Sequence, residues 1–205
     1  PGDKTMNKAH LPVALLAGGL ATRLRPITEK IPKLLIPVAG HPFAYHQLHA
    51  LKKRGVTEVL LSIAHLGEQI RDYVGDGSKF ALKVDYIDEG TELKGTAGAL
   101  RLALDQGKLN EQFLVTYGDS YLQVDYQDVY SKFLFSGKPA LMTVLLNANQ
   151  WDKSNVWYED HAVKLYDKFK KHTEHAKKLQ YIDYGLSAFE KETIERFVPS
   201  GGKQD

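Results

Sequence analysis

Residues 11–33 read LPVALLAGGLATRLRPITEKIPK, and this stretch decides the fold. Residues 11–17 form a short apolar run that stops at Gly18 and Gly19, a pattern typical of a buried strand that runs into a glycine loop. Because glycine has no side chain, such a loop lets backbone N–H groups approach a ligand and form an anion-binding hollow. The stretch therefore predicts a sheet with a ligand loop at the end of its first strand.

The rest of the chain alternates strand and helix patterns. Further strands are predicted at 59–63, 83–87, 113–117, 140–146 and 181–189, with a two-stranded excursion at 156–158 and 163–166. Helices are predicted between Pro42 and Gly55, at 67–73, after a Thr96 cap, and around 129–134. This alternation predicts an α/β class: a Rossmann-like three-layer α/β/α architecture with a mostly parallel mixed sheet. Ligands bind beyond the carboxyl ends of such strands, where Gly18 and Asp119 both fall.

Composition narrows the classes of function. The 205 residues suit one domain over 11–205, and 27 basic against 25 acidic residues give a net charge of +2. This balance gives no general case for a nucleic-acid or membrane partner. The absence of cysteine excludes disulfides, thiolate nucleophiles and cysteine zinc sites, and is compatible with a cytoplasmic location. Residues 1–10 are polar, are not a signal peptide, and are interpreted as a tag or flexible amino end.

Polar residues after the glycines concentrate positive charge. Thr22, Arg23 and Arg25 follow at once, and Lys33 comes later. Neither the Walker A pattern GxxxxGK[ST] nor the dinucleotide fingerprint GxGxxG is present. The pattern indicates a phosphate site of another kind.

At these residues the chain resembles the sugar-1-phosphate nucleotidyltransferases, whose signature is a strand followed by GGxxTRLxPxTxxxPKxxxPVxGxP. The matching positions are Gly18-Gly19, Thr22-Arg23-Leu24, Pro26, Thr28, Pro32-Lys33, Pro37-Val38, Gly40 and Pro42. The resemblance continues through 95–100, 118–119, 166–168 and 182–186. It is nearest to bacterial heptose- or mannose-1-phosphate guanylyltransferases, or to N-acetylmuramate-1-phosphate uridylyltransferases. It implies a nucleotide-diphospho-sugar transferase fold with a nucleotide-binding part at about 11–120 and a sugar-phosphate part at about 121–205.

The resemblance also implies a reaction. A sugar 1-phosphate oxygen attacks the α-phosphorus of a nucleoside triphosphate, so that a nucleotide-sugar forms and pyrophosphate leaves. A phosphate monoester is already an anion at neutral pH, so the nucleophile needs no general base. The difficulty is to bring two polyanions together, which cations and Mg²⁺ must offset.

The resemblance assigns roles to particular residues. Arg23, Lys33 and Asp119 are the expected catalytic residues, and Asp119 is also the expected Mg²⁺ ligand. The expected nucleotide-binding residues are Ala17, Gly18, Gly19, Thr22, Arg23, Gly95 and Thr96. The expected sugar-phosphate-binding residues are Lys33, Ser154, Asn155, Lys168, Asp183 and Gly185.

Two departures from the family pattern keep alternatives open. Glu89-Gly90 replaces the Glu-Pro or Gln-Pro of many members in the segment that recognises the base, so the nucleotide does not follow directly from this sequence. The resemblance makes GTP with heptose or mannose 1-phosphate the first choice and UTP with an N-acetylated sugar the second. The family also draws a second metal carboxylate from a late D-x-G-T/S-P segment, which these 205 residues lack, and we therefore expect the sequence to be shortened at its carboxyl end. This lack keeps open a non-catalytic nucleotide-sugar-binding module of the same fold. A homo-oligomer is also left open.

Overall fold

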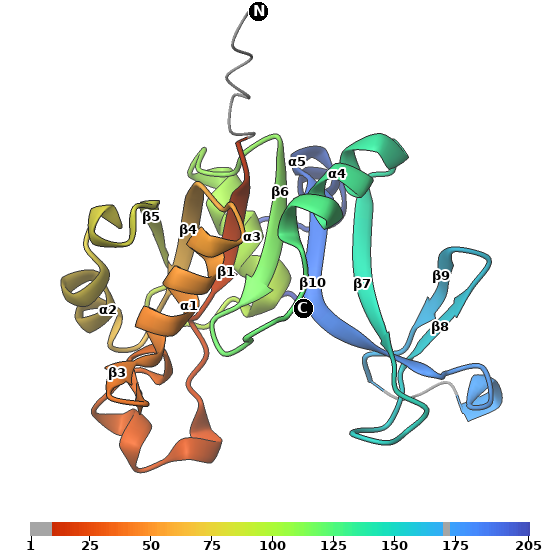
Figure 1. Ribbon diagram of the computed structural model, residues 1–205, viewed down its shortest axis with the longest axis horizontal. Helices are drawn as coiled ribbons and strands as arrows, with labels where there is room; N and C mark the ends of the chain where they lie inside the picture. Colours follow the sequence, from red (N-terminus) through yellow and green to blue (C-terminus); the bar gives the residue numbers. More distant parts are fainter. Residues whose placement is uncertain (1–9, 170–172) are drawn as a thin grey trace, which may run out of the picture.

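The computed structural model describes residues 10–169 and 173–205, so the expectation for residues 1–9 lies outside the described residues. Its main feature is an eight-stranded sheet in the order β5-β4-β1-β6-β10-β8-β9, with β7 paired to β10 (Figure 1). The strands are β1 (Pro12–Leu16), β4 (Glu58–Ile63), β5 (Lys83–Asp88), β6 (Gln112–Tyr117), β7 (Ala140–Leu146), β8 (Val156–Glu159), β9 (Ala162–Tyr166) and β10 (Tyr181–Glu190). A separate small pair joins β2 (Pro37–Val38) to β3 (His41–Pro42).

The sheet is mixed in the way the sequence predicts. β5, β4, β1 and β6 run parallel, with Val13 of β1 opposite Val59 of β4 and Leu114 of β6. β10 then runs antiparallel to β6 and β7. Strands buried on both faces read as continuous apolar runs, as β1 and β4 do. The predicted mostly parallel sheet is confirmed.

Helices cover both faces of this sheet, which gives three layers. The helices are α1 (Phe43–Lys53), α2 (Gly67–Val74), α3 (Gly95–Asp105), α4 (Tyr126–Ser136) and α5 (Lys191–Phe197). Leu48 of α1, Ile70 of α2 and Phe133 of α4 pack in one core with Leu15 of β1. Alternate strand residues face a second core, in which Ala14 packs with α3 and α5. The Rossmann-like architecture is thus confirmed (Figure 1).

The start of α3 corrects the sequence analysis. Thr96 does not cap the helix, because Lys94 is the N-cap residue and Thr96 lies in the first turn. The first N–H groups of α3 are instead met by the end of the described chain: Thr96 N donates to Asp205 Oδ1 at 3.3 Å and Gly98 N to Gln204 O at 3.1 Å. A distant segment therefore satisfies the orphan donors that a local side chain was expected to satisfy.

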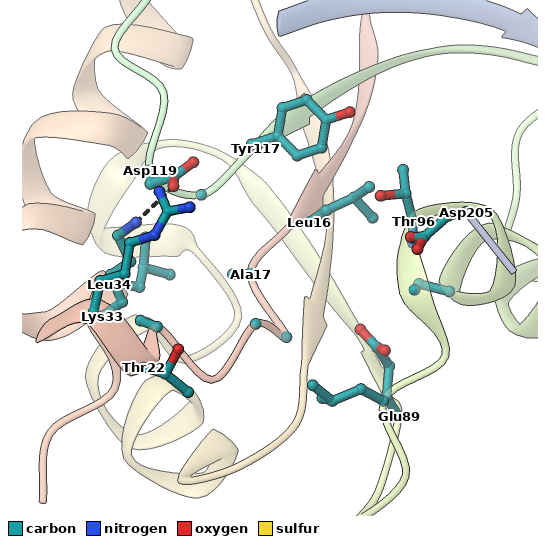
Figure 2. A pocket seen from close by; sticks show the side chains of 18 of the residues that line it. Leu16, Ala17, Thr22, Lys33, Leu34, Glu89, Thr96, Tyr117, Asp119 and Asp205 are labelled. Carbon is teal, nitrogen blue, oxygen red and sulfur yellow. Dashed lines mark hydrogen bonds and ion pairs between the residues drawn. The ribbon is translucent and has the colours of Figure 1, made fainter. Parts of the chain in front are cut away.

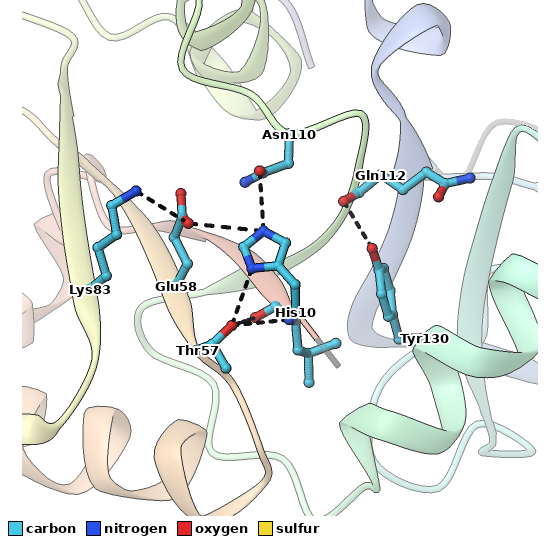
Figure 3. A network of polar contacts seen from close by, with 8 residues as sticks. His10, Thr57, Glu58, Lys83, Asn110, Gln112 and Tyr130 are labelled. Carbon is cyan, nitrogen blue, oxygen red and sulfur yellow. Dashed lines mark hydrogen bonds and ion pairs between the residues drawn. The ribbon is translucent and has the colours of Figure 1, made fainter. Parts of the chain in front are cut away.

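Polar contacts connect the amino ends of the parallel strands, at the end of the sheet opposite the glycine loop (Figure 3). Thr57 Oγ1 accepts from Leu11 N at 3.0 Å, and His10 Nε2 lies 3.3 Å from Asn110 Oδ1. Glu58 lies 3.5 Å from Lys83 and 3.9 Å from the His10 ring. These contacts fix the register of the first strand and leave its carboxyl end for the ligand loop.

Within residues 10–169 and 173–205, no helix is both long and apolar enough to cross a membrane.

Candidate active site

The main cavity lies at the carboxyl ends of β1 and β6 and has a volume of about 490 Å³. Three parts of the chain surround it (Figure 2). The loop after β1 lies with Lys33 and Asp119, a second loop carries Glu89, and the first turn of α3 lies with Tyr117 and Asp205. This is the edge at which ligands bind in open α/β sheets. All the predicted nucleotide-binding and catalytic residues line this cavity: Ala17, Gly18, Gly19, Thr22, Arg23, Lys33, Gly95, Thr96 and Asp119.

The glycine loop begins where β1 ends. Ala17 N donates to Ser62 O at 3.0 Å, and Gly118 N donates to Leu16 O at 2.8 Å, so the loop is fixed to both neighbouring strands. A Cβ atom at Gly18 would collide with the Glu89 carboxylate, whereas one at Gly19 would meet nothing within 4 Å. Only the first glycine is therefore required for close packing.

The next turns present the cations. Ala21 takes a left-handed conformation (φ 47°), and the short helix Thr22–Leu24 that follows presents Arg23 at the cavity. A second short helix, Lys33–Leu35, is anchored by Leu34, which is buried. Lys33 Nζ lies 2.6 Å from Asp119 Oδ2, across the gap between this helix and the end of β6 (Figure 2). The two groups are joined although 86 residues separate them.

Glu89 forms the wall beside Gly18. The residue is only 8% exposed, and its carboxylate accepts from Ser62 Oγ at 2.6 Å and from Lys94 N at 2.9 Å. Buried carboxylates need such donors. Each oxygen keeps a further lone pair for a ligand in the cavity.

Tyr117, Thr96 and Asp205 form the remaining wall, which we call the α3 wall. Burial raises the pKa of Tyr117 to about 12, with a further contribution from the charge of Asp183, and the Thr96 side chain hydrogen-bonds its phenol. The phenol is therefore neutral and keeps its proton through the physiological range. Asp205 Oδ1 accepts from Thr96 N and lies 3.7 Å from Lys168 Nζ.

The predicted sugar-phosphate residues, apart from Lys33, do not line the main cavity, and among them Lys168 and Asp183 interact with the α3 wall. Lys168 reaches that wall through Asp205. Asp183 Oδ1 accepts from Gly185 N at 2.8 Å, where β10 is irregular and Gly185 has a φ of +93°. Burial raises the pKa of Asp183, and the Lys168 charge opposes that rise. Burial and then the Asp183 charge raise the pKa of Tyr166 as well, so Asp183, Lys168, Tyr166 and Tyr117 share one polar region.

Ser154 and Asn155 belong to a structural loop next to this region. Ser154 is buried, and its hydroxyl accepts from Asn147 Nδ2 at 2.9 Å and from Asn149 N at 3.1 Å. Asn155 N donates to Tyr181 O at 2.9 Å, and its side-chain Oδ1 is buried without a hydrogen-bond partner among the described residues. These contacts assign the pair a supporting position, and their predicted contact with the sugar phosphate stays a prediction.

Magnesium suits the oxygen chemistry of the cavity only together with a bound ligand. Nowhere in the part of the chain that the structure describes do three histidine or acidic side chains gather in a way that could hold a metal ion. Asp119 is a single, half-exposed carboxylate. Mg²⁺ is commonly held by one or two carboxylates plus substrate phosphates, so Asp119 fits a metal that arrives with a triphosphate.

Sequence reasoning missed Tyr117 and Asp205 as cavity residues, and it placed Glu89 near the base without giving its side chain a role. A polar residue at the end of an apolar strand, directly before Gly118-Asp119, was the available signal for Tyr117. Asp205 gave no local signal, because its position depends on a chain return from α5.

The sheet order, the glycine loop and the basic side chains near Asp119 define an α/β protein with a cation-lined cavity at the carboxyl ends of its parallel strands. The chain belongs to the nucleotidyl transferase family, whose sequence model matches residues 13–157. It is 28% identical over 204 residues to a UTP–glucose-1-phosphate uridylyltransferase of Synechocystis, covering 93% of this chain and 52% of that one. It is 38% identical over 112 residues to an N-acetylmuramate α-1-phosphate uridylyltransferase of Neisseria meningitidis, covering 55% of this chain and 48% of that one.

A solved structure has the same fold. HddC from Yersinia pseudotuberculosis in complex with GMP-PN superposes with a TM-score of 0.70 at 27% identity, over 94% of this chain and 82% of that chain. The chain spans between a third and about half the length of the curated relatives it matches first.

Proposed function

We propose that the protein is a nucleotidylyltransferase that joins a nucleoside triphosphate to a sugar 1-phosphate. A bond forms between a phosphate oxygen of the sugar 1-phosphate and the α-phosphorus. The bond from the α-phosphorus to the bridging oxygen breaks, and pyrophosphate leaves with its electron pair. The observation that carries this proposal is the Lys33–Asp119 pair beside Arg23 and the glycine loop, in one cavity.

The basic side chains in the cavity offset the electrostatic repulsion between the two anionic substrates. Two unit charges about 4 Å apart repel by roughly 4 kcal/mol at an effective dielectric of 20, and both substrates carry several charges. Arg23 and Lys33 line the cavity and offset that repulsion, while Gly18 and Gly19 let backbone N–H groups reach the phosphates. Positioning and charge stabilisation then suffice, since the nucleophile is already an anion.

Asp119 is the residue proposed to hold Mg²⁺ with the triphosphate oxygens. A bound Mg²⁺ would neutralise charge on the phosphates and orient them for in-line displacement. Lys33, 2.6 Å from Asp119 Oδ2, keeps the carboxylate directed at the cavity.

Glu89 favours guanine as the base. Its carboxylate only accepts hydrogen bonds. Guanine offers two adjacent donors, N1–H and the N2 amino group, whereas uracil offers one N–H between two carbonyl oxygens that a carboxylate repels. A nearly buried carboxylate beside Gly18 therefore supports GTP over UTP. Lys168, beside the cavity, is the proposed ligand of the sugar phosphate.

Pyrophosphate release from the full chain tests the proposal. We expect release that requires an NTP, a sugar 1-phosphate and Mg²⁺ together, with GTP and mannose or heptose 1-phosphate the preferred pair. Tight nucleotide binding without pyrophosphate release would instead favour a non-catalytic nucleotide-sugar-binding module.

The Glu89→Gln variant tests base choice separately. An amide presents a donor to the donors of guanine, so we expect the GTP/UTP ratio of kcat/KM to fall at least about tenfold. Asp88→Asn, at an exposed neighbouring carboxylate, is the matched control and should keep the ratio. An unchanged ratio in Glu89→Gln would remove Glu89 from base recognition.

A further inference from the structure

Tyr117 and Asp205 of the α3 wall have no part in the proposed roles of the base and phosphates. Glu89 and Gly18 lie together on one side of the cavity, and Lys33 and Asp119 form the pair on another (Figure 2). Tyr117 and Asp205 face the cavity from a third side, and Lys168 lies 3.7 Å from Asp205. If Lys168 holds the sugar phosphate, the ring attached to that phosphate meets the α3 wall.

Hydrogen bonds and close packing fix the backbone of the α3 wall. Gln204 N donates to Lys94 O at 2.8 Å and Gly98 N donates to Gln204 O at 3.1 Å, which fixes the backbone beside Asp205. A Cβ atom at Gly95 would collide with the Gln204 carbonyl, so a larger residue there would push this segment away. The backbone thus holds the Asp205 carboxylate against the first turn of α3.

The ion pair between Asp205 and Lys168 contributes little to stability. The two side chains are 40% and 41% exposed, and ion pairs this exposed are worth little, since water screens them. One oxygen of the Asp205 carboxylate accepts from Thr96 N, which leaves the second oxygen available to a ligand in the cavity.

We infer that Tyr117 and Asp205 bind one ring hydroxyl of the sugar, with Tyr117 donating a hydrogen bond to it and Asp205 accepting one from it. This inference rests on the proposed function. A hydroxyl group both accepts and donates, and so matches a phenol and a carboxylate together. An N-acetylamino group at the same ring position also offers a donor and an acceptor, but on two separate atoms, its N–H and its carbonyl oxygen, and it adds the bulk of an acetyl group. A single hydroxyl oxygen between the phenol and the carboxylate is therefore the better match, and the site favours a sugar with a free hydroxyl at this position.

The phenol is suited to this role. Burial, with the nearby Asp183 charge, raises the pKa of Tyr117 to about 12, so it stays a donor at any pH at which the enzyme would act. Its hydroxyl extends toward the side of the cavity where Thr96 and Asp205 lie (Figure 2).

The test compares variants across sugars that lack one hydroxyl at a time. The full chain is assayed with mannose 1-phosphate and glucose 1-phosphate and with their monodeoxy analogues. For the better parent sugar, Tyr117→Phe and Asp205→Asn should each raise KM about three- to tenfold, with kcat and the KM of the nucleotide within about twofold. For one deoxy analogue, wild type and both variants should have equal KM, because the missing hydroxyl removes the interaction that the variants remove.

A matched control is Tyr121→Phe, since Tyr121 is 54% exposed and does not line the cavity. This variant should behave as wild type with every sugar. If Tyr117→Phe keeps the parent KM, or raises KM by the same factor for every analogue, the inference is wrong while the proposed function stands. If wild type releases pyrophosphate with none of these sugars and with no heptose 1-phosphate, the proposed function and the inference both fail.

Discussion

Lys33 Nζ and Asp119 Oδ2 lie 2.6 Å apart, and this contact joins the loop after β1 to the end of β6. Both side chains are 40–49% exposed, so the pair contributes at most about 1 kcal/mol to stability. The pair is thus placed for chemistry at the cavity rather than for holding the sheet together.

Asp119→Ala should separate activity from stability. We expect pyrophosphate release to fall at least about 100-fold, because the proposed metal ligand is lost, while the free energy of unfolding changes by less than about 1 kcal/mol. Asp128→Ala is the matched control, since Asp128 also pairs with a lysine at 2.6 Å and is similarly exposed but lies on α4. Near-normal turnover in Asp119→Ala would exclude its assigned role.

Gly18 and Gly19 should respond differently to alanine. Gly18→Ala drives a Cβ atom into the Glu89 carboxylate, and we expect a loss of about 1–3 kcal/mol in stability with weaker nucleotide binding. Gly19→Ala meets open space and should change stability by less than about 0.5 kcal/mol. Thermal unfolding and nucleotide titration measure both effects.

A double variant identifies the cause. In the Glu89→Ala background the clashing carboxylate is gone, so adding Gly18→Ala should cost much less stability than it does in wild type. An equal cost of Gly18→Ala in both backgrounds would show that the Glu89 contact is not what requires glycine.

The sequence predicts this site as far as local patterns reach. Residues 11–17 and 113–117 are apolar runs that are each followed by glycine. Both strands, and the meeting of their carboxyl ends at one end of the sheet, can therefore be predicted from hydrophobic pattern and composition. The glycine loop and the cations at Arg23 and Lys33 follow from a contiguous signature. Every one of these features is encoded within a few residues.

Long-range contacts account for what the sequence did not predict. The cap of α3 comes from Gln204 and Asp205 rather than from Thr96, and nothing near Thr96 indicates that. The approach of Glu89 to Gly18 likewise depends on how β5 pairs with β4. Which distant donor or acceptor meets a local group is decided by tertiary packing, so it could not be derived from spacing.

Asp183 should give stability an inverse dependence on pH. Burial raises its pKa in the folded protein above the ordinary value of 3.8. The contribution of Asp183 to the free energy of unfolding is therefore fully present below about pH 3.8. It is lost as the pH rises through the raised pKa, because the folded state then holds a poorly solvated carboxylate. Asp183→Asn should raise Tm by a few degrees at pH 7–8, and the difference from wild type should shrink in acid.

Asp85→Asn is a control of opposite sign. Burial tends to raise the Asp85 pKa, but the hydrogen bonds from Tyr86 N and Lys108 outweigh it, and the net pKa is lowered. This variant should lower Tm at neutral pH, with the difference again shrinking in acid. A Tm gain in Asp183→Asn that is constant from pH 3 to pH 8 would contradict the titration argument.

Arg101 should be the side chain that fixes the path from α5 to the cavity. Its Nη1 donates to Glu195 O at 3.1 Å and to Val198 O at 2.8 Å, and its Nε donates to Asp105 at 2.9 Å. Arg101→Ala leaves carbonyls at the end of α5 without these donors, which should cost about 1–3 kcal/mol in urea unfolding. Arg101→Lys should recover only part of this, because one ammonium cannot reproduce the guanidinium fork that spans Asp105 and two carbonyls.

Since the chain after Val198 leads to Asp205, both variants should also raise the KM of the sugar 1-phosphate more than that of the nucleotide. Equal stability of Arg101→Ala and wild type, or full recovery by lysine, would show that the carbonyls are satisfied without the fork.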